Sequence, residues 1–386
     1  MQNYHQTIPV VLQQAKGVHV YDVDGRPYLD FLAAYSAVNQ GHCHPRLVNA
    51  MIDQASTLTL TSRAFKSNLL PQFSDMITKL LGYERVLPMN TGVEAGEVAV
   101  KLARKWAYQV KKVPKNQAKI VLAKNNFWGR SLAAVSSSTD PEAYTNFGPL
   151  LAGFQLINFD DIEDLESAIS DPNTAAFMVE PIQGEGGVVV PASTYLNEAR
   201  RLCTKYNVLL ICDEVQTGLG RTGKMLAVDH NNIKPDILCL GKALSGGMMP
   251  VSCILADHDV MSQIKPGQHG STYGGNPMAC RVAMEALSIL VEENLAENSR
   301  IQGERFRKEI EGFHSPLVKE VRGLGLMNAL ILNLDKEQTW NVTMELAANG
   351  LLCKPTKDNI LRLSPPLTIN DHEMSQALDI MRRVLC

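Results

Sequence analysis

The chain has 386 residues, of which 45% are hydrophobic and 20% charged, a composition typical of a globular protein with one large domain and a smaller companion. Its formal net charge is −3, and no long basic run is present, which argues against nucleic acid as a partner. No apolar run approaches the ~20 residues that a membrane-spanning helix needs. We therefore expect neither a nucleic-acid partner nor a membrane span.

Eight cysteines are scattered along the chain without a Cys-x-x-Cys pair, and several, such as Cys212 and Cys239, lie inside apolar runs. Buried free thiols in a reducing compartment explain this pattern better than a disulfide framework does. The first residues are polar and do not resemble a signal peptide. We expect a cytoplasmic protein, with the mitochondrial matrix as the alternative if a targeting peptide has been removed.

Short apolar runs alternate with helix-period segments through the middle of the chain. The runs predict strands buried on both faces, because they lack polar alternation, at 119–122, 176–179, 208–212, 237–240 and 251–255. Between them, the spacing of apolar residues predicts helices over 98–106 and 195–206. Strands that alternate with helices indicate an α/β fold, in which helices cover a mostly parallel central sheet.

The pattern changes after Asn276-Pro277, which predicts a helix start with an N-cap residue and a proline at the first helical position. A turn at 323–325, a short apolar run at 360–363 and a last amphipathic helix then indicate an α+β arrangement. The expected domains are a large one, 36–295, and a small α+β one built from both chain ends, 1–35 and 296–386.

Three charged residues follow predicted strands, at the sheet edge where open parallel sheets bind ligands: Glu180, Asp213 and Lys242. A neutral lysine there can attach a carbonyl cofactor covalently, and an ionised aspartate can hold a protonated pyridine nitrogen. Taken singly, such residues are more often surface charges or helix caps. Together, Lys242 and Asp213 predict a site for pyridoxal phosphate (PLP).

A phosphate site is indicated at 91–94, directly before the helix predicted over 98–106. Backbone N–H groups at a helix start bind anions, and Gly92 permits a close approach. Many Thr-Gly pairs are simply turns, so this motif alone is a weak signal.

Two other motifs have simpler explanations than a cofactor or a metal. The stretch 218–223 matches Gly-x-Gly-x-x-Gly, yet it does not begin in the turn that leaves the strand, and no second strand follows where a dinucleotide site needs one. The run 42–44, His-Cys-His, has no partner pair at metal-ligand spacing. We expect turns at both places and no metal site.

Blocks of sequence, taken in order, resemble the class III aminotransferases of PLP fold type I, and most closely the ornithine aminotransferases. These blocks are 36–45, 89–96, 127–130, 179–185, 213–218, 241–247 and 269–277. The resemblance runs from Tyr4 to beyond Arg362, nearly the whole chain, and the blocks are highly specific in combination. The 218–223 motif overlaps one of them.

The resemblance implies PLP as the cofactor and a set of residues that bind it. Lys242 would carry PLP and move a proton, Asp213 would pair with the pyridine N–H, and Gln216 would contact the phenolic oxygen. Phe127 and Val215 would lie on the two faces of the ring. The cofactor-binding residues so implied are Gly92, Val93, Phe127, Asp213, Val215, Gln216, Lys242, Ser271 and Thr272.

The resemblance also implies how L-ornithine and 2-oxoglutarate share one pocket. Arg130 would bind the α-carboxylate of ornithine, because a guanidinium matches a carboxylate in a bidentate manner. Arg362 would take the extra carboxylate of 2-oxoglutarate, and Glu185 would neutralise Arg362 while ornithine is bound. The substrate-binding residues so implied are Tyr4, Tyr35, Trp128, Arg130, Glu185 and Arg362.

The activity that the resemblance implies is transfer of the δ-amino group of L-ornithine to 2-oxoglutarate, giving glutamate 5-semialdehyde, which cyclises to pyrroline-5-carboxylate, and glutamate. Thr272 is expected to reach the phosphate of a neighbouring subunit, so the active unit would be a homodimer. The alternative is an acetylornithine or 4-aminobutyrate aminotransferase. Gly186, where ornithine enzymes often have alanine, leaves that alternative open, whereas Tyr35 and Trp128 favour a free α-amino group.

Two alternatives from other functional classes have weaker support in the sequence. A nicotinamide-dependent oxidoreductase would depend on the 218–223 motif alone. A protein that only binds a ligand would not need Lys242 together with Asp213.

Overall fold

The computed structural model describes residues 7–386, and a seven-stranded sheet forms its centre. The strands, in order across this sheet, are β4 (Arg85–Met89), β10 (Ser252–Ala256), β9 (Ile237–Leu240), β8 (Leu209–Asp213), β7 (Thr174–Val179), β5 (Lys119–Ala123) and β6 (Phe154–Ile157). The five strands predicted from apolar runs all belong to it, and β4 and β6 are additional. The expected α/β class with a mostly parallel sheet is therefore confirmed.

One strand of this sheet, β10, runs against its neighbours. It pairs antiparallel with both β9 and β4, whereas β5, β6, β7, β8 and β9 pair in parallel. The connection from Leu240 to Ser252 contains only a short 3-10 helix, Lys242–Ser245, and a parallel crossover needs a dozen or more residues, usually with a full helix. The chain therefore returns antiparallel, and Lys242 lies in this short connection.

Helices cover both faces of the sheet, which explains the strands without polar alternation. In β8, Leu209 and Ile211 pack in the cluster that contains the α4 residues, whereas Leu210 and Cys212 pack in the cluster on the other face, with α8. We call this sheet with its helices the large lobe. Its helices are α2 (Pro45–Ala55), α3 (Leu69–Leu81), α4 (Gly92–Trp106), α5 (Leu132–Ser136), α6 (Pro141–Tyr144), α7 (Ile162–Ile169), α8 (Tyr195–Lys205), α9 (His258–Met261) and α10 (Pro277–Glu292).

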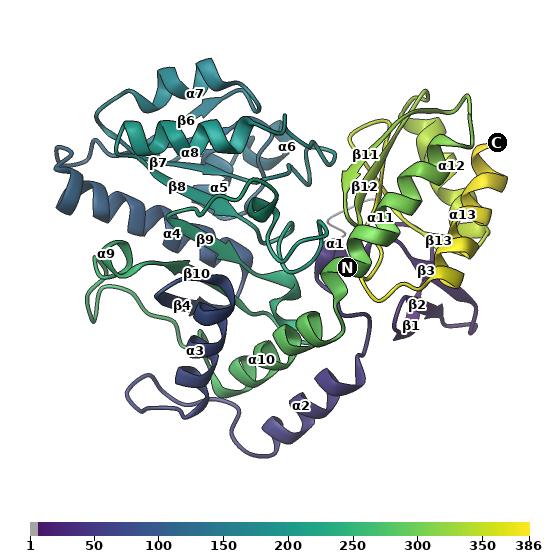
Figure 1. Ribbon diagram of the computed structural model, residues 1–386, viewed down its shortest axis with the longest axis horizontal. Helices are drawn as coiled ribbons and strands as arrows, with labels where there is room; N and C mark the ends of the chain where they lie inside the picture. The colour runs from purple at the N-terminus through teal and green to yellow at the C-terminus, as the bar shows by residue number, and fades with distance from the viewer. Residues whose placement is uncertain (1–6) are drawn as a thin grey trace.

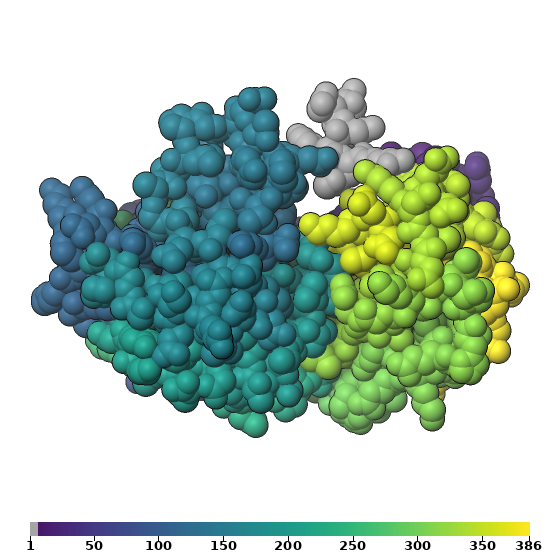
Figure 2. Space-filling view, turned by 90° about the horizontal axis from the view of Figure 1, so that it is seen from above, coloured from purple at the N-terminus to yellow at the C-terminus, as the bar shows by residue number. Residues whose placement is uncertain are grey.

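A second, smaller lobe stands beside the first and unites the two ends of the described chain (Figure 1). One of its sheets joins β1 (Leu12–Lys16), β2 (His19–Asp22) and β3 (Pro27–Asp30) to β13 (Leu351–Leu352), and the other contains β11 (Val318–Leu324), β12 (Met327–Leu332), β15 (Ile360–Leu363) and β14 (Lys354–Thr356). Its helices are α11 (Leu295–Glu311), α12 (Lys336–Ala348) and α13 (Asp371–Leu385). From above, the teal middle of the chain and the yellow-green C-terminal part lie side by side (Figure 2).

Helix α10 leads from the large lobe toward the small one, and it begins as predicted. The Asn276 side chain accepts a hydrogen bond from the Ala279 N–H at 2.8 Å, and Pro277 occupies the first position of the helix. Of the eight cysteines, only Cys43 and Cys386 are exposed, and all are free thiols. Within residues 7–386, no helix is both long and apolar enough to cross a membrane.

Candidate active site

A cavity of about 260 Å³ opens at the C-terminal ends of β7 and β8, beside the connection that leaves β9. We call it the inner cavity. Its lining contains eight of the residues that the resemblance implied for cofactor or substrate, together with Gly129 and Glu180, as follows: Gly92, Val93, Phe127, Trp128, Gly129, Glu180, Asp213, Val215, Gln216 and Lys242. The structure therefore brings most of the expected cofactor residues to one place.

Lys242 is held in an uncommon backbone conformation. Its φ of 44° lies in the left-handed region, which costs a non-glycine residue on the order of 1 kcal/mol. Burial, together with the positive charge of Arg362, lowers the pKa of the Lys242 amine to about 8. A substantial fraction of this amine is therefore neutral, and so nucleophilic, near physiological pH.

Two buried carboxyl groups, Asp213 and Glu180, face the same cavity and differ in charge. Burial raises the pKa of Asp213 to about 6, while the Val215 N–H, 3.0 Å from its Oδ1, favours the ionised form. Burial and the neighbouring Asp213 raise the pKa of Glu180 to about 8. At neutral pH, Asp213 is therefore the ionised member of the pair, as a partner for a cationic ring nitrogen must be.

Glu180 was noted at a strand end but received no role from the sequence. Its Oε1 accepts a hydrogen bond from the Phe127 N–H at 2.9 Å, and its Oε2 accepts one from the Gly184 N–H at 3.1 Å. It thus ties together two loops that border the cavity. This function can be recognised only from the two hydrogen bonds that Glu180 accepts from loop N–H groups, and the sequence does not reveal those bonds.

The N-terminus of α4 forms the end of the cavity that suits a phosphate. Thr91 and Glu94 make a reciprocal capping box, which leaves the first-turn amides of Gly92 and Val93 for an outside acceptor. Gly92 is required by packing, because a Cβ there would lie 2.8 Å from Cγ1 of Val215. The absence of a side chain lets Val215 close one side of the cavity.

Ser271 and Thr272 are not among the described residues that line the inner cavity. The Ser271 hydroxyl accepts hydrogen bonds from the Asn90 side chain at 3.1 Å and the Gly274 N–H at 2.9 Å. Thr272 borders a separate cavity of about 320 Å³ together with Arg63. Thr272 therefore does not line the inner cavity of its own chain.

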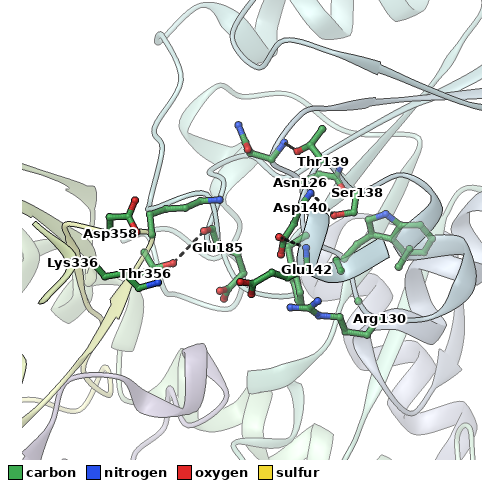
Figure 3. A pocket seen from close by; sticks show the side chains of 17 residues that line it. Asn126, Arg130, Ser138, Thr139, Asp140, Glu142, Glu185, Lys336, Thr356 and Asp358 are labelled. Carbon is green, nitrogen blue, oxygen red and sulfur yellow. Dashed lines mark hydrogen bonds between the residues drawn. The ribbon is translucent and has the colours of Figure 1, made fainter. Parts of the chain in front are cut away.

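An outer cavity of about 350 Å³ adjoins the inner one and shares Phe127, Trp128 and Gly129 with it. Figure 3 shows Arg130, Asp140 and Glu142 on the side of the large lobe, facing Thr356 and Asp358 of the small lobe, with Glu185 between them. This cavity thus lies between the two lobes and is lined by charges of both signs.

Trp128 lines both cavities and is held in place by two contacts. It is buried, and its indole N–H donates to the Ser137 hydroxyl at 2.9 Å. A Cβ on Gly96 would lie 2.6 Å from the indole ring, so the ring rests on α4 where only glycine leaves room. Its N–H is therefore already paired, and Trp128 can contact a ligand only through its ring. Beside it, the Arg130 guanidinium lies 5.6 Å from the centroid of the Phe127 ring.

Arg362 is the central residue of a group that we call the wall, which also contains Glu185, Tyr35 and Lys354. It is 3% exposed, forms a close ion pair with Glu185 through Nη1, and donates from Nη2 to the Gln216 side-chain oxygen at 2.7 Å. Burial alone would raise the pKa of Glu185, but the Arg362 charge and hydrogen bond hold it below its ordinary value. Glu185 is therefore ionised, and the arginine is masked by a carboxylate, as the resemblance implied.

Tyr35 belongs to this wall and lies in a turn whose backbone is left-handed. The four residues of α1 (Ala33–Ser36) all have positive φ, with Tyr35 at 59°. Its ring centroid lies 5.1 Å from the Arg362 guanidinium, and its hydroxyl accepts a hydrogen bond from Lys354 Nζ at 2.9 Å. Lys354 was not foreseen from the sequence. Tyr4, the other predicted tyrosine, lies outside the described residues.

The two discounted motifs have structural functions. His42 Nε2 lies 2.7 Å from Asp30 Oδ2, and His44 Nδ1 accepts a hydrogen bond from the Arg46 N–H at the start of α2. In the 218–223 stretch, the buried Arg221 guanidinium donates to the carbonyls of Leu326 and Pro365. Within residues 7–386, no cluster of three potential metal-ligand side chains occurs.

The chain matches the family model of the class III aminotransferases over residues 1–385. It is 58% identical over 383 residues to a Drosophila melanogaster protein named ornithine aminotransferase, mitochondrial. The matched region covers 99% of this chain and 88% of the Drosophila protein. A Toxoplasma gondii ornithine aminotransferase structure, described with partial occupancy of PLP at its active site, is 49% identical with a TM-score of 0.98, covering 99% of this chain and 90% of that one. An acetylornithine aminotransferase from Elizabethkingia anophelis is 48% identical with a TM-score of 0.91, covering 100% of this chain and 95% of that one. The chain belongs to the class III aminotransferase family.

Proposed function

We propose that this protein is an L-ornithine:2-oxo-acid δ-aminotransferase that uses PLP and produces glutamate 5-semialdehyde and glutamate. The observation that carries the proposal is the ion pair between Glu185 and Arg362. It belongs to the same site as the inner cavity, which Lys242 lines. An arginine that a carboxylate masks reversibly lets one pocket accept a cationic substrate and a dicarboxylate in turn. The names of the relatives support ornithine as the amino donor.

The residues of the inner cavity fit PLP in chemistry and in placement. A partly neutral lysine, an ionised buried aspartate and two free helix-terminal amides match the aldehyde, the pyridine nitrogen and the phosphate of the cofactor. When bound, PLP supplies an electron sink that stabilises the carbanion formed at the carbon bearing the amine.

The chain itself holds groups in place and moves a proton. Lys242 would hold the cofactor through its amine and would carry the proton away from the amine-bearing carbon of the substrate. Asp213 keeps the ring nitrogen protonated, because an adjacent negative charge favours the cationic form. Val215 and Phe127 flank the ring, and Gly92 and Val93 donate their amides to the phosphate.

The outer cavity binds the end of ornithine that does not react. Arg130 binds the α-carboxylate, and Tyr35 lies on the α-amino side. In the second half of the reaction, Arg362 takes the distal carboxylate of 2-oxoglutarate, and Glu185 gives way. The charged lining of this cavity, with Asp140 and Glu142, suits a free ammonium better than an acetylated amine.

Assembly, domain division and compartment are part of the same proposal. We infer a homodimer in which Thr272 of one chain completes the phosphate site of the other. We also propose the division into 1–35 with 296–386 and 36–295, which the presence of two lobes supports. The Drosophila relative is named mitochondrial, which supports the mitochondrial matrix as the compartment over the cytoplasm.

The test is a substrate panel. We expect kcat/KM for L-ornithine to exceed the values for N-acetylornithine and 4-aminobutyrate by at least about 10-fold, because a polar group left unpaired in the site costs ~1–3 kcal/mol. A higher value for N-acetylornithine would replace this proposal with the acetylornithine alternative and leave the PLP chemistry unaffected.

A further inference from the structure

Lys354 occupies a position in the charged wall that the known reaction leaves unexplained. In the sheet of the small lobe it stands directly opposite Arg362, because β14 and β15 pair antiparallel in that register. Directly opposite side chains lie on the same face, with Cβ atoms about 4.5–5.5 Å apart, and like charges there repel. Two cations thus lie side by side.

Both cations contact the same tyrosine. The Lys354 ammonium lies 5.6 Å from the centroid of the Tyr35 ring and donates to its hydroxyl, while the Arg362 guanidinium lies 5.1 Å from the same centroid. Among residues 7–386, Lys354 has no ion pair with any carboxylate, whereas Arg362 is paired with Glu185. Only one of the two neighbouring charges is neutralised.

Glu185 lies beside both of them. The Thr356 hydroxyl, two residues along β14 and so on the same face as Lys354, donates to the Glu185 carbonyl at 3.3 Å. Burial raises the pKa of the Glu185 carboxyl, Arg362 lowers it most strongly, and the positive charges of Lys242 and then Lys354 lower it further. Both Arg362 and Lys354 therefore act on the Glu185 carboxylate.

We propose that Lys354 is a positioning residue that receives the Glu185 carboxylate when a substrate carboxylate takes Arg362. Resting on the proposed function, this assignment explains how the pocket opens to a dicarboxylate at low cost. Without a second cation, the displaced carboxylate would stay partly buried, unpaired and next to the incoming negative charge. With Lys354, both carboxylates keep a partner.

Binding of glutarate, an unreactive dicarboxylate, to the holoenzyme tests this directly and needs no turnover. Lys354→Gln keeps a donor for the Tyr35 hydroxyl but removes the charge, and we expect it to weaken glutarate binding by about 10- to 100-fold. Lys354→Arg should restore most of the affinity. Lys319→Gln, which removes an exposed lysine on β11, is the matched control and should leave binding unchanged.

The two half-reactions provide a second readout, which also serves if Lys354→Gln binds glutarate too weakly to measure. The conversion driven by 2-oxoglutarate should fall by about the same factor as glutarate affinity, whereas conversion by pyruvate, which lacks the second carboxylate, and by ornithine should change by less than about 3-fold. An equal loss with pyruvate and 2-oxoglutarate, or unchanged glutarate affinity, would overturn the role of Lys354.

A double-mutant cycle shows whether Lys354 acts through Glu185. In the Glu185→Gln background, Lys354→Gln should have little further effect on glutarate binding, because no carboxylate then needs the second cation. The same loss in both backgrounds would mean that Lys354 contacts the ligand itself, and the inference would be wrong. Failure of the proposed function looks different, since the unmodified enzyme would then not convert ornithine.

Discussion

The floor and the wall of the active site are built in different ways. The floor consists of Glu180, Asp213 and Lys242, each at or just beyond the end of a strand in one continuous sheet. The wall combines Tyr35 from a turn near the N-terminus, Glu185 from a loop of the large lobe, and Arg362 with Lys354 from the small lobe. The floor is fixed within one sheet, whereas the wall forms only where three segments of the chain meet.

This difference separates the residues assigned to the reaction from those assigned to the choice of substrate. The floor is buried and perturbed in pKa, and it contains Lys242 and Asp213, to which we assign the attachment of PLP and the pairing with its ring nitrogen. We propose that the wall contacts the variable part of the substrate, and its ion pair spans the two lobes. Changes in the floor should therefore affect all substrates alike, whereas changes in the wall should affect some substrates more than others.

The largest effect is expected for Lys242→Ala. Removing the group to which we assign the proton transfer should lower turnover of every amine by about 10⁴-fold or more, while the fold and some PLP binding persist. Steady-state rates with ornithine and glutamate, and circular dichroism for the fold, provide the measurement. Lys115→Ala, at an exposed lysine, is the control. Substantial turnover in the Lys242 variant would refute its attachment to the cofactor.

Asp213→Asn should lower turnover of all substrates by about 10²- to 10³-fold. The variant loses the charge that keeps the ring nitrogen protonated, and so weakens the electron sink. The ratio of kcat/KM for ornithine to that for glutamate should stay within about 3-fold of the unmodified value. Near-normal rates would show that another residue holds the pyridine nitrogen.

In the wall, Tyr35→Ile should reduce kcat/KM for ornithine by about 10- to 100-fold and admit 4-aminobutyrate. An amine without the α-amino group leaves the polar pocket unpaired, at ~1–3 kcal/mol, and the substitution relieves that loss. Tyr35→Phe, which keeps the ring over Arg362 and loses only the bond from Lys354, separates the hydroxyl from the ring. A parallel fall for both amines would mean that Tyr35 only packs.

The smallest effect concerns the stability of the protein without cofactor. Because burial raises the folded pKa of Asp213 from 3.8 to about 6, its ionisation destabilises the fold progressively as pH rises through that interval, and fully above it. Cofactor-free Asp213→Asn should therefore be more stable than the parent at pH 7.5, by about 1–3 kcal/mol, and lose this advantage near pH 4. Thermal unfolding at both values provides the measurement. An equal difference at both would place the effect elsewhere.

The sequence predicted the floor well, because its signals are local. Apolar runs mark β7, β8 and β9, and the residue that follows each run necessarily lies at the strand end. The strands that escaped prediction lack this signal. Strand β4 contains Pro88, which is tolerated because β4 is the edge strand, and β6 is only partly buried. The antiparallel direction of β10 depends on the length of its connection, which apolar pattern does not reveal.

The wall could not be derived from local pattern. Glu185 and Arg362 were identified through a family resemblance, and their pairing depends on contacts across the two lobes. Lys354 was missed because its function depends on strand register opposite Arg362. The left-handed turn that carries Tyr35 contains Ala33 and Ala34 at positive φ, and alanine gives no sequence signal for that conformation.

One ratio tests the division between floor and wall most directly: kcat/KM for ornithine over that for glutamate, in the unmodified enzyme and in Glu185→Gln. The substitution removes the charge that masks Arg362, so glutamate should compete better at its α-amine. We expect the ratio to fall by at least about 10-fold, with the absorption spectrum of bound PLP unchanged. If both substrates fell by the same factor, Glu185 would not select substrate, and the account of the wall would be contradicted.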